Sequence, residues 1–344
     1  MMEYVTLGNS DLKVSRICMG CMGFGDASSG QHSWTLNEND SKAIIKRGLE
    51  LGINFFDTAI GYQSGTSEKY LGKAIKEYAN RDDVVIATKF VPRSKEEIAK
   101  GISGKQHVLN SLDKSLANLD MDHVDLYIYH MWDWNTPVEE YLEGLNEAVK
   151  AKKVRYIGIA NCFAWQLEMA NNIARANGWP QFISVQNHYN LIMREEEREM
   201  NVYAKLHNIA LTPYSALAAG RLAKRPDETS KRLELDAYAK FKYDASIDKD
   251  AKVIEKVMEI ADRHQVSMTQ VSLAWLLTKV SSAIVGATKI SHVEGAVRSL
   301  DLKLSANEIR ELEELYEPHF LSGVMAQNRP ENRNDEQVWI KNAK

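Results

Sequence analysis

The sequence predicts a single (β/α)8 barrel, an α/β fold in which helices surround eight parallel strands. Eight short apolar runs rich in Val, Ile, Phe or Tyr occur along the 344 residues, as is typical of strands buried on both faces. Longer amphipathic stretches separate these runs, and eight strands close a parallel sheet without leaving an edge. A doubly wound sheet is the competing fold. It is disfavoured because no G-x-G-x-x-G follows the first run.

The elements follow one another in a regular alternation. The expected strands, in chain order, are Arg16–Gly20, Asn54–Asp57, Val84–Thr88, Asp125–His130, Val154–Ala160, Phe182–Asn187, Ala210–Tyr214 and Ala283–Gly286. Apolar residues recur at helical spacing from Val108 to Leu119, from Val138 to Val149 and from Val253 to Ala261. The glycines of Gly48–Gly52 and Gly178 mark helix ends before the next strand.

Two segments depart from this alternation. The interval after the seventh strand is the longest, and its charged part, Arg221–Asp248, is expected to be a long loop on the active-site face of the barrel. A surface helix around Arg232–Phe241 is the alternative. Residues 325–344 are polar and are expected to form a mobile C-terminal tail, which leaves residues 1–324 as the barrel domain.

The composition is that of an ordinary globular protein, with 44 % hydrophobic and 26 % charged residues. A net charge of −4 without a block of Lys or Arg argues against a nucleic-acid partner or an anionic membrane surface. No apolar stretch approaches the ~20 residues that span a bilayer, and no secretory signal is recognised, so the expected location is the cytoplasm. The three cysteines, Cys18, Cys21 and Cys162, are interpreted as buried thiols, and no metal site is expected.

Polar residues stand at the carboxyl ends of several expected strands. Asp57 ends the second run, Lys89 follows the third, His130 ends the fourth, and Tyr62 lies five residues beyond Asp57. In a barrel these ends converge on one mouth, so we expect the four side chains to meet. Taken singly, each also suits a structural role, such as a helix cap, a solvated strand end or a core histidine.

Together the four side chains suit the protonation of a carbonyl oxygen. A tyrosine hydroxyl is a poor acid near neutrality, since its ordinary pKa is about 10. We expect the neighbouring Lys89 ammonium to lower the pKa of Tyr62, and Asp57 to hold Lys89 charged. His130 can donate a hydrogen bond to an oxygen on which negative charge develops.

The stretch Ile53–Leu71, INFFDTAIGYQSGTSEKYL, resembles the signature of the aldo-keto reductase family, and Val84–Lys89 and Val124–His130 resemble the family's Lys and His segments. The resemblance extends from Leu7–Gly8 to about Pro318. It implies a (β/α)8 barrel that reduces aldehydes or ketones with NADPH, or with NADH, and needs no metal. It also implies that Tyr62 is the proton donor, that Asp57 and Lys89 tune it, and that His130 orients the carbonyl.

The same resemblance implies a cofactor site around the barrel mouth. Asn161 and Gln186 match the residues that hold the nicotinamide carboxamide, with Asp57 beside them, and Tyr214 matches the aromatic residue that stacks on the nicotinamide ring. The matching residues around the pyrophosphate are Ser215, Leu217, Gly220 and Arg221, and those around a 2′-phosphate are Gly286, Thr288, Lys289 and His292. Backbone donors, a cation and a helix N-terminus suit a phosphate and favour NADP over NAD.

Three differences from the family pattern affect the cofactor rather than the four chemical residues. Ala160 stands where Ser or Thr is frequent, Ala216 where Pro is frequent, and Gly295–Ala296 where an acidic and an amide residue hold the adenine. For the substrate, a small carbonyl compound, we expect aromatic walls from Trp34, Phe90 and Trp132, although each also suits ordinary packing.

Two other functions compete with carbonyl reduction. The stretches HMWDWNTPVEE and QNHYNLIMREEEREM are similar to a bacterial subgroup associated with 1-deoxyxylulose-5-phosphate formation, which implies a sugar-phosphate reductase or rearrangement enzyme. Such an enzyme needs a second anion site, for which Arg221, Lys224 and Arg225 are candidates. A cofactor-sensing subunit without catalysis is the other alternative. The residues leave the oligomeric state, the physiological substrate and the reaction direction open.

We further expect Arg221–Asp248 to fold over the bound dinucleotide as a lid. The segment is long and charged and has no strong apolar stripe, which indicates marginal local stability in the free protein.

Overall fold

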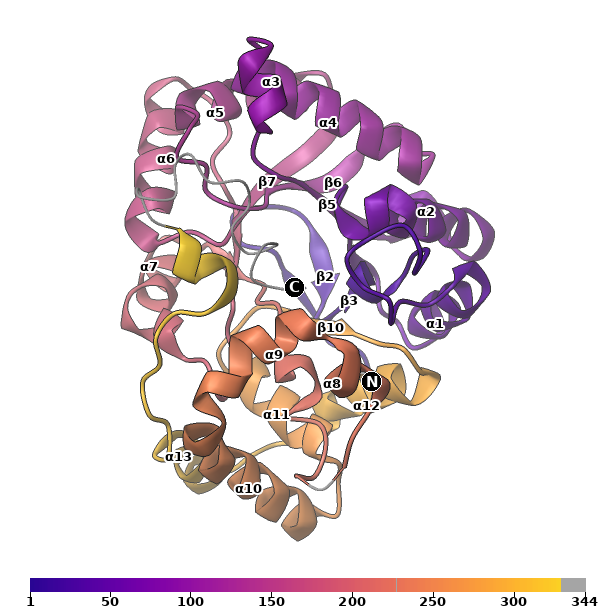
Figure 1. Ribbon diagram of the computed structural model, residues 1–344, viewed down its shortest axis with the longest axis vertical. Helices are drawn as coiled ribbons and strands as arrows, with labels where there is room; N and C mark the ends of the chain where they lie inside the picture. Colours follow the sequence, from indigo (N-terminus) through magenta and orange to yellow (C-terminus); the bar gives the residue numbers. More distant parts are fainter. Residues whose placement is uncertain (227, 329–344) are drawn as a thin grey trace.

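The computed structural model describes residues 1–226 and 228–328. Its centre is a sheet of eight parallel strands in the order β10-β3-β4-β5-β6-β7-β8-β9 (Figure 1). The bounds are β3 Ile17–Gly20, β4 Phe55–Asp57, β5 Val85–Phe90, β6 Val124–Tyr129, β7 Val154–Ala160, β8 Ser184–Gln186, β9 Ala210–Leu211 and β10 Ala283–Gly286. Each strand falls on one of the eight apolar runs, which confirms the predicted fold class.

Backbone hydrogen bonds close the sheet into a barrel between its first and last strands. The amide of Ser281 donates to the carbonyl of Leu211 at 3.0 Å, and the amide of Ile284 donates to that of Pro213 at 3.1 Å. Both acceptors lie in or just beyond β9, and Ile284 lies in β10. The carboxyl ends of all eight strands therefore surround one mouth.

Helices cover the outside of the barrel. They are α1 Glu38–Glu50, α2 Thr66–Tyr78, α3 Lys95–Ala99, α4 Gly104–Leu119, α5 Val138–Lys150, α6 Ala164–Ala176, α7 Met200–Leu206, α8 Lys231–Leu235, α9 Ala237–Tyr243, α10 Ile247–His264, α11 Met268–Leu277, α12 Ile290–Arg298 and α13 Ala306–Glu313. Capping residues fix several starts: the side chains of Asn37, Ser267 and Ser305 accept hydrogen bonds from the backbone amides three residues further along. Gly52 and Gly178, with φ of 88° and 65°, lie just beyond the ends of α1 and α6, as predicted. The expectation that Gly48 marks a helix end is wrong: Gly48 lies within α1, where a Cβ would lie 2.4 Å from the Met19 side chain.

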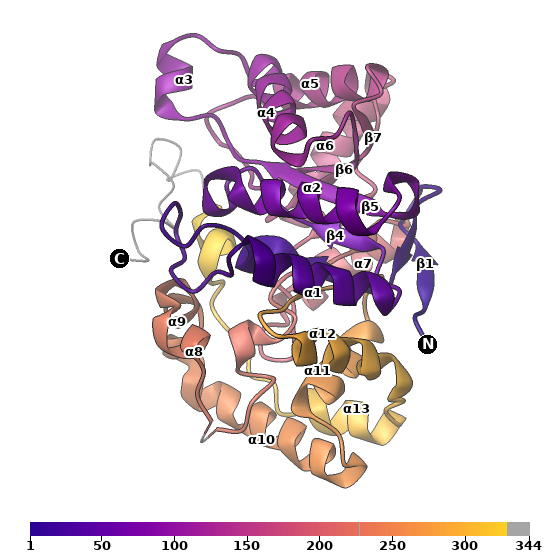
Figure 2. The ribbon, with the colours of Figure 1, turned by 90° about the vertical axis from the view of Figure 1, so that its right-hand side faces the viewer.

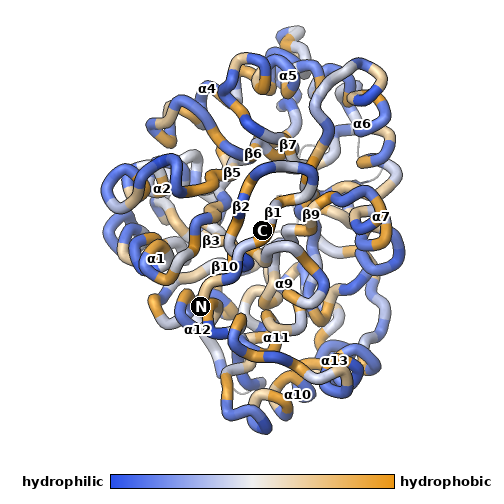
Figure 3. The backbone as a smooth tube through the Cα atoms, turned by 180° about the vertical axis from the view of Figure 1, so that it is seen from behind, coloured by the Kyte–Doolittle hydropathy of each residue, from blue (hydrophilic) through white to orange (hydrophobic). Residues whose placement is uncertain are grey.

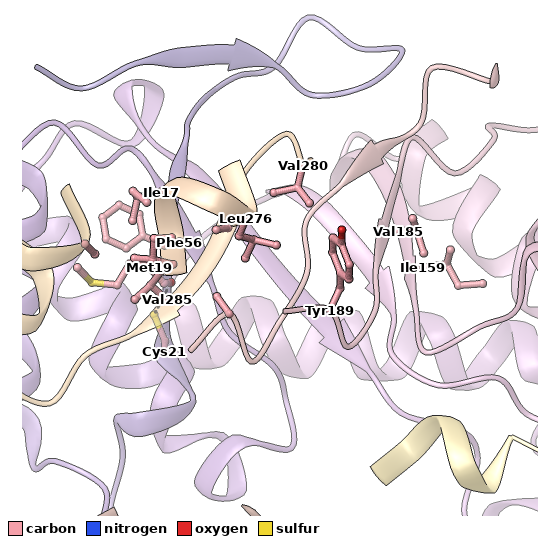
Figure 4. Close-up of a cluster of buried hydrophobic side chains, with 14 of the residues drawn as sticks. Ile17, Met19, Cys21, Phe56, Ile159, Val185, Tyr189, Leu276, Val280 and Val285 are labelled. Atoms are coloured by element: carbon pink, nitrogen blue, oxygen red, sulfur yellow. Dashed lines mark hydrogen bonds between the residues drawn. The ribbon is translucent and has the colours of Figure 1, made fainter. Parts of the chain in front are cut away.

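The apolar core has two layers. The larger cluster fills the space between strands and helices, and Figure 4 shows Ile17, Met19 and Val285 of adjacent strands close to Leu276 of α11. A smaller cluster, with Phe55 and Leu126, fills the barrel interior. Neighbouring residues of one strand therefore serve different layers, because successive side chains point to opposite faces.

A hairpin that the sequence analysis did not predict covers the end of the barrel opposite the mouth. Its antiparallel strands are β1 Tyr4–Thr6 and β2 Lys13–Ser15, and the buried Leu7, Leu12 and Val14 join the interior cluster. Figure 2 shows β1 on the far side of the molecule from α8 and α9, and Figure 3 shows both hairpin strands from behind. Gly8 permits this packing, since its φ is 55° and a Cβ there would lie 2.2 Å from the carbonyl oxygen of Ile183.

The long interval after the seventh barrel strand, β9, contains α8 and α9, which lie in front of the barrel in Figure 1. The side chains of Ser230 and Asp236 cap these two short helices. The second part of the segment expected as a loop, from Lys231 onward, is thus largely helical, in agreement with the alternative of a helix around Arg232–Phe241.

The chain beyond α13 returns to the barrel. Residues Gly323–Gln327 form the short 3-10 helix η8, in which Met325 is buried, and Asn328 is buried as well. Asn328 donates from Nδ2 to the carbonyl of Asn161 at 3.1 Å and accepts from Trp134 Nε1 at 3.1 Å. The expected start of a mobile tail at Met325 is therefore corrected, because residues 325–328 pack on the barrel. Residues 329–344 lie outside the described part of the chain.

Candidate active site

Three barrel strands bring together the four residues expected to carry the chemistry. Asp57 is the last residue of β4, Lys89 lies near the end of β5, and His130 directly follows β6. Tyr62 begins the short 3-10 helix η2 Tyr62–Gly65 in the loop after β4. The four side chains meet at the mouth, as predicted.

Lys89 is the centre of this group. Its side chain is fully buried, and its ammonium Nζ donates to Asp57 Oδ1 at 2.6 Å, to the carbonyl of Thr58 at 2.7 Å and to the Tyr62 hydroxyl at 3.1 Å. Burial opposes the charge, but Asp57 and Tyr62 outweigh it and raise the pKa of Lys89 above its ordinary value. Lys89 is consequently a fixed cation at every physiological pH.

Tyr62 lies between Lys89 and His130 and is partly exposed at the mouth. Its hydroxyl accepts the Lys89 hydrogen bond, and the Lys89 Nζ lies 4.7 Å from its ring centroid. Burial raises the pKa of Tyr62 and outweighs the lowering by Lys89. The expected net lowering is thus wrong for the free protein, because desolvation of a phenolate exceeds the stabilisation by one ammonium. Tyr62 carries a proton at neutral pH.

His130 packs edge-on against Tyr62, with ring centroids 6.0 Å apart and an interplanar angle of 80°. Burial and then the Lys89 charge lower the pKa of His130 well below its ordinary value, so the ring is neutral. Its Nδ1 is buried and has no hydrogen-bond partner among the described residues. A neutral imidazole has one N–H donor. The side chain is therefore suited to hydrogen-bond an uncharged oxygen.

The residues expected around the nicotinamide join the same network. Gln186, the last residue of β8, donates from Nε2 to Asp57 Oδ2 at 2.9 Å. Asn161 follows β7, donates from Nδ2 to the carbonyl of His130 at 2.9 Å, and accepts at Oδ1 from the Tyr214 hydroxyl at 2.9 Å. His188, which sequence reasoning missed, stacks on Tyr214 with centroids 5.5 Å apart and planes at 20°.

The segment expected around the pyrophosphate continues directly from Tyr214. Ser215 has φ of 59°, Leu217 precedes the 3-10 turn η5 Ala218–Gly220, and Gly220 has φ of 106°, a conformation that only glycine adopts readily. Arg221 ends the turn. One of its nitrogens, Nη2, donates to Asp244 Oδ1 at 2.7 Å, whereas its buried Nη1 has no hydrogen-bond partner among the described residues.

The residues expected around a 2′-phosphate follow β10. Gly286 ends the strand, Thr288 lies in the connecting loop, and Lys289 is the residue at which α12 begins. His292 lies in the first turn of α12 and accepts at Nδ1 from the backbone amide of Thr288 at 3.4 Å. These residues gather at the N-terminus of a helix, where backbone N–H groups favour anions.

The aromatic residues expected to line a substrate pocket lie in three different places. The expectation that Phe90 lines the pocket is wrong. Phe90 is fully buried in the outer core, and its ring stacks on that of Tyr129, with centroids 5.3 Å apart and planes at 8°. Because Lys89 points into the barrel, the next side chain must point outward. Trp34 is buried, and the Arg232 guanidinium lies 4.5 Å from the centroid of the Trp34 ring. Trp34 therefore lies on the side of the mouth where the cofactor is expected, which we call the cofactor side.

Trp132, two residues after His130, belongs to a cluster of three tryptophans. Its ring centroid lies 6.4 Å from that of Trp134 and 6.3 Å from that of Trp165, and the last two rings are 6.0 Å apart. Trp165 is 47 % exposed. Sequence reasoning missed Trp134 and Trp165. Trp134 lies within HMWDWNTPVEE, the stretch that is similar to the bacterial subgroup.

The residues on the cofactor side fit an anionic, ring-bearing dinucleotide. Two buried donors there, Arg221 Nη1 and Trp34 Nε1, have no hydrogen-bond partner among the described residues. The cationic side chains of Arg221, Arg232 and Lys289 stand near this side of the mouth. Buried donors without partners are costly, so their presence indicates a ligand that accepts hydrogen bonds.

The sequence matches the profile of the aldo/keto reductase family over residues 16–317, which is most of its length. This chain belongs to the aldo/keto reductase family. The enzyme is accordingly an oxidoreductase that acts on carbonyl or alcohol groups, and enzymes of the family use NAD(P)H.

Fungal relatives and a solved structure agree with this assignment. The reductase is 38 % identical to the versiconal hemiacetal acetate reductase of Aspergillus parasiticus, over 92 % of this chain and 98 % of the relative. It is 32 % identical to norsolorinic acid reductase B of Dothistroma septosporum, over 92 % and 83 %. A thermostable aldo-keto reductase in complex with the inhibitor epalrestat superposes with a TM-score of 0.73 at 27 % identity, covering 91 % of this chain and all of that one.

Two further observations concern sites of other kinds. The described helices include none that is long and apolar enough to cross a membrane. Within residues 1–226 and 228–328, no group of three or more His, Cys, Asp or Glu side chains is arranged to hold a metal ion. Cys18, Cys21 and Cys162 are free thiols, all buried, and burial raises the pKa of each.

Proposed function

We propose that this aldo-keto reductase reduces the carbonyl group of ring-bearing aldehydes or ketones with NADPH, and that Tyr62 donates the proton. One observation carries the proposal. A single fixed cation, Lys89, joins Asp57 to the Tyr62 hydroxyl, while the neutral His130 packs against the Tyr62 ring.

The chemistry follows from these contacts. When bound, the reduced nicotinamide supplies a hydride to the carbonyl carbon. Tyr62 gives its hydroxyl proton to the carbonyl oxygen, and the O–H bond of Tyr62 breaks as that of the alcohol forms. Lys89 stabilises the resulting phenolate at 3.1 Å, and a proton from solvent then restores the hydroxyl. His130 donates a hydrogen bond to the reacting oxygen. Alcohol oxidation uses the same groups in reverse.

The preference for NADPH rests on the start of α12. Lys289 and the first backbone amides of the helix offer a cation and N–H donors to a 2′-phosphate. NADH lacks the 2′-phosphate, so we propose it as the weaker second cofactor.

The substrate class rests on the tryptophan cluster of Trp132, Trp134 and Trp165. Hydrogen bonds tie it to the site, since Trp134 donates to Asn328, Asn328 donates to the carbonyl of Asn161, and Asn161 donates to the carbonyl of His130. Large aromatic faces next to the carbonyl-orienting residue favour flat, ring-bearing substrates over short aliphatic ones.

Replacement of Tyr62 by Phe tests the proposal. The substitution keeps the ring and removes the transferable proton, and general acid catalysis is worth ~10²–10⁴-fold, so we expect a loss of that size in turnover of aromatic aldehydes. NADPH binding, followed by tryptophan fluorescence, should change little. Tyr78→Phe, at the partly exposed last residue of α2, is the matched control. Near-normal turnover by Tyr62→Phe would contradict the assignment of Tyr62 as the proton donor.

The narrower functions remain predictions. None of the relatives named above carries a sugar-phosphate activity in its name, and the loop cation Arg225 pairs with Asp262. A purely cofactor-sensing role would leave the proton-donor network without a use. We also propose the cytoplasm as the location, since three free thiols suit a reducing compartment.

A further inference from the structure

Lys242 is a second buried lysine, on the inserted helix α9, and neither the sequence analysis nor the family resemblance assigned it a role. Its side chain is only 6 % exposed. The ammonium Nζ donates to Ser215 Oγ at 3.0 Å, and no carboxylate of the described residues lies within ion-pair distance of it. A buried ammonium without a counterion is costly, so the proton of Lys242 is held weakly unless an anion lies beside it.

Aromatic rings surround the ammonium. Its Nζ lies 4.9 Å from the ring centroid of Tyr214, 5.2 Å from that of Tyr243 and 5.7 Å from that of Tyr238. The faces of these rings attract a cation but replace only part of the hydration that burial removes. The backbone of η8 closes another side, since a Cβ on Gly323 would lie 3.3 Å from the Lys242 side chain.

Two arginines stand in the same cluster, and each already has a carboxylate. Arg221 pairs with Asp244 at 2.7 Å, and Arg232 pairs with Asp236 at 3.2 Å. Three cationic side chains thus share two carboxylates. Burial, and then Arg232 and Arg221, lower the pKa of Lys242 to about 7, against a smaller opposing effect of Asp236.

The surplus positive charge faces the cofactor side of the mouth. Lys242 contacts Tyr214 and Ser215, the start of the segment expected around the pyrophosphate. Arg221, at the end of that segment, independently presents the buried Nη1 that has no partner among the described residues. Both observations indicate an anion that the cluster is built to receive.

We infer that Lys242 binds the pyrophosphate of the dinucleotide, and that binding adds a proton to its side chain. The inference rests on the proposed function, in that the ligand is a nicotinamide dinucleotide. We assign the pyrophosphate and not the 2′-phosphate because Lys242 contacts Ser215, whereas Lys289 stands at α12. NADH and NADPH, which share the pyrophosphate, should therefore depend on Lys242 equally.

The pH dependence follows from the sign of the coupling. A bound phosphate favours the ammonium and raises the pKa of Lys242 above its value of about 7 in the free enzyme. The contribution of Lys242 to affinity is thus complete below pH 7 and is lost as the pH rises toward the pKa of the complex, by about tenfold per pH unit.

The other titratable side chains packed against Lys242 are His188 and three tyrosines. Burial lowers the pKa of His188 well below its ordinary value, and it raises those of Tyr214, Tyr238 and Tyr243. The remaining charged groups that face Lys242 are Arg221, Arg232 and Asp236. Proton uptake that the native enzyme shows and that Lys242→Met lacks therefore reports Lys242.

Titration calorimetry with NADH, in two buffers of different ionisation enthalpy, measures both affinity and proton uptake. NADH is the better probe because the 2′-phosphate of NADPH itself titrates near pH ~6. We expect the native enzyme to take up about one proton at about pH 8.5 and almost none at about pH 6. Lys242→Met should take up none and should bind both NADH and NADPH about tenfold or more weakly at about pH 6.

Two further variants make the result decisive. Lys242→Arg stays charged, so we expect NADH affinity that does not fall between about pH 7 and about pH 8.5, without proton uptake. This variant also decides the matter if Lys242→Met does not fold. Lys240→Met removes an exposed lysine from the same helix and should behave like the native enzyme.

Each outcome has one meaning. Equal affinity and equal proton uptake in the native enzyme, Lys242→Met and Lys242→Arg would overturn the inference while leaving the proposed function intact. A loss confined to NADPH would also overturn it, by assigning Lys242 to the 2′-phosphate. Failure of the native enzyme to bind either dinucleotide would overturn the proposed function itself.

Discussion

The two buried lysines of the barrel mouth, Lys89 and Lys242, show how a counterion decides the behaviour of a buried charge. Lys89 has Asp57 at 2.6 Å, and the pKa of Lys89 is raised. Among the described residues, Lys242 has the Ser215 hydroxyl at 3.0 Å and no carboxylate, and the pKa of Lys242 falls to about 7. Burial is nearly complete in both. Lys89 is therefore charged before any ligand binds, whereas the charge of Lys242 on α9 depends on the ligand.

The largest effect should come from breaking the ion pair between Lys89 and Asp57. Lys89→Met leaves Asp57 buried without its cation, which costs about 3–5 kcal/mol of unfolding free energy, and it removes the stabilisation of the Tyr62 phenolate. We expect turnover to fall by ~10²–10⁴-fold. Thermal unfolding and steady-state reduction of an aromatic aldehyde measure the two losses.

The double variant Lys89→Met with Asp57→Asn separates these losses. It removes both charges, so much of the stability should return while turnover stays low. A single variant that unfolds like the native enzyme would contradict the central role of this ion pair.

The second test makes Lys242 resemble Lys89. Ser215→Asp places a carboxylate next to the Lys242 ammonium, and Asp tolerates the left-handed φ of 59° at this position. The new pair should raise the pKa of Lys242, abolish proton uptake and weaken NADH by about tenfold, since the carboxylate competes with the pyrophosphate. The calorimetric titration described above measures all three. Undiminished proton uptake would show that another group carries the proton.

The third test concerns Lys289, which should separate the two cofactors where Lys242 does not. Lys289→Ala removes a cation that only the 2′-phosphate can use, and a charge-assisted hydrogen bond of about 1.5–3 kcal/mol corresponds to a loss of about tenfold or more. We expect this loss for NADPH and little change for NADH. Equal losses, measured by fluorescence titration, would remove Lys289 from the phosphate site.

The smallest effect should be the slowing of amide exchange in the inserted segment. α8 and α9 are short and bring the ion pairs of Arg221 and Arg232 over the cofactor side. Bound phosphates should tighten this segment, so hydrogen exchange between Arg221 and Asp248 should slow with NADPH, while that of α4 stays constant. Identical exchange with and without NADPH would make the segment ordinary surface.

The sequence by itself determined the eight strands and the four residues of the catalytic cluster. Strands buried on both faces need unbroken apolar runs, and Asp57, Lys89 and His130 stand where three of these runs end, so local pattern and topology gave the same answer. Alternation from the inward-pointing Lys89 already places Phe90 in the outer layer, so the sequence also determined this position. The tertiary structure decided the contacts between remote segments. It alone placed the β1–β2 hairpin under the barrel, Asn328 against Asn161, and Lys242 beside Ser215, where no carboxylate of the described residues pairs with it. These contacts join segments that are remote in the chain. Helical periodicity and strand alternation are local patterns, so they do not indicate whether a remote side chain provides a counterion.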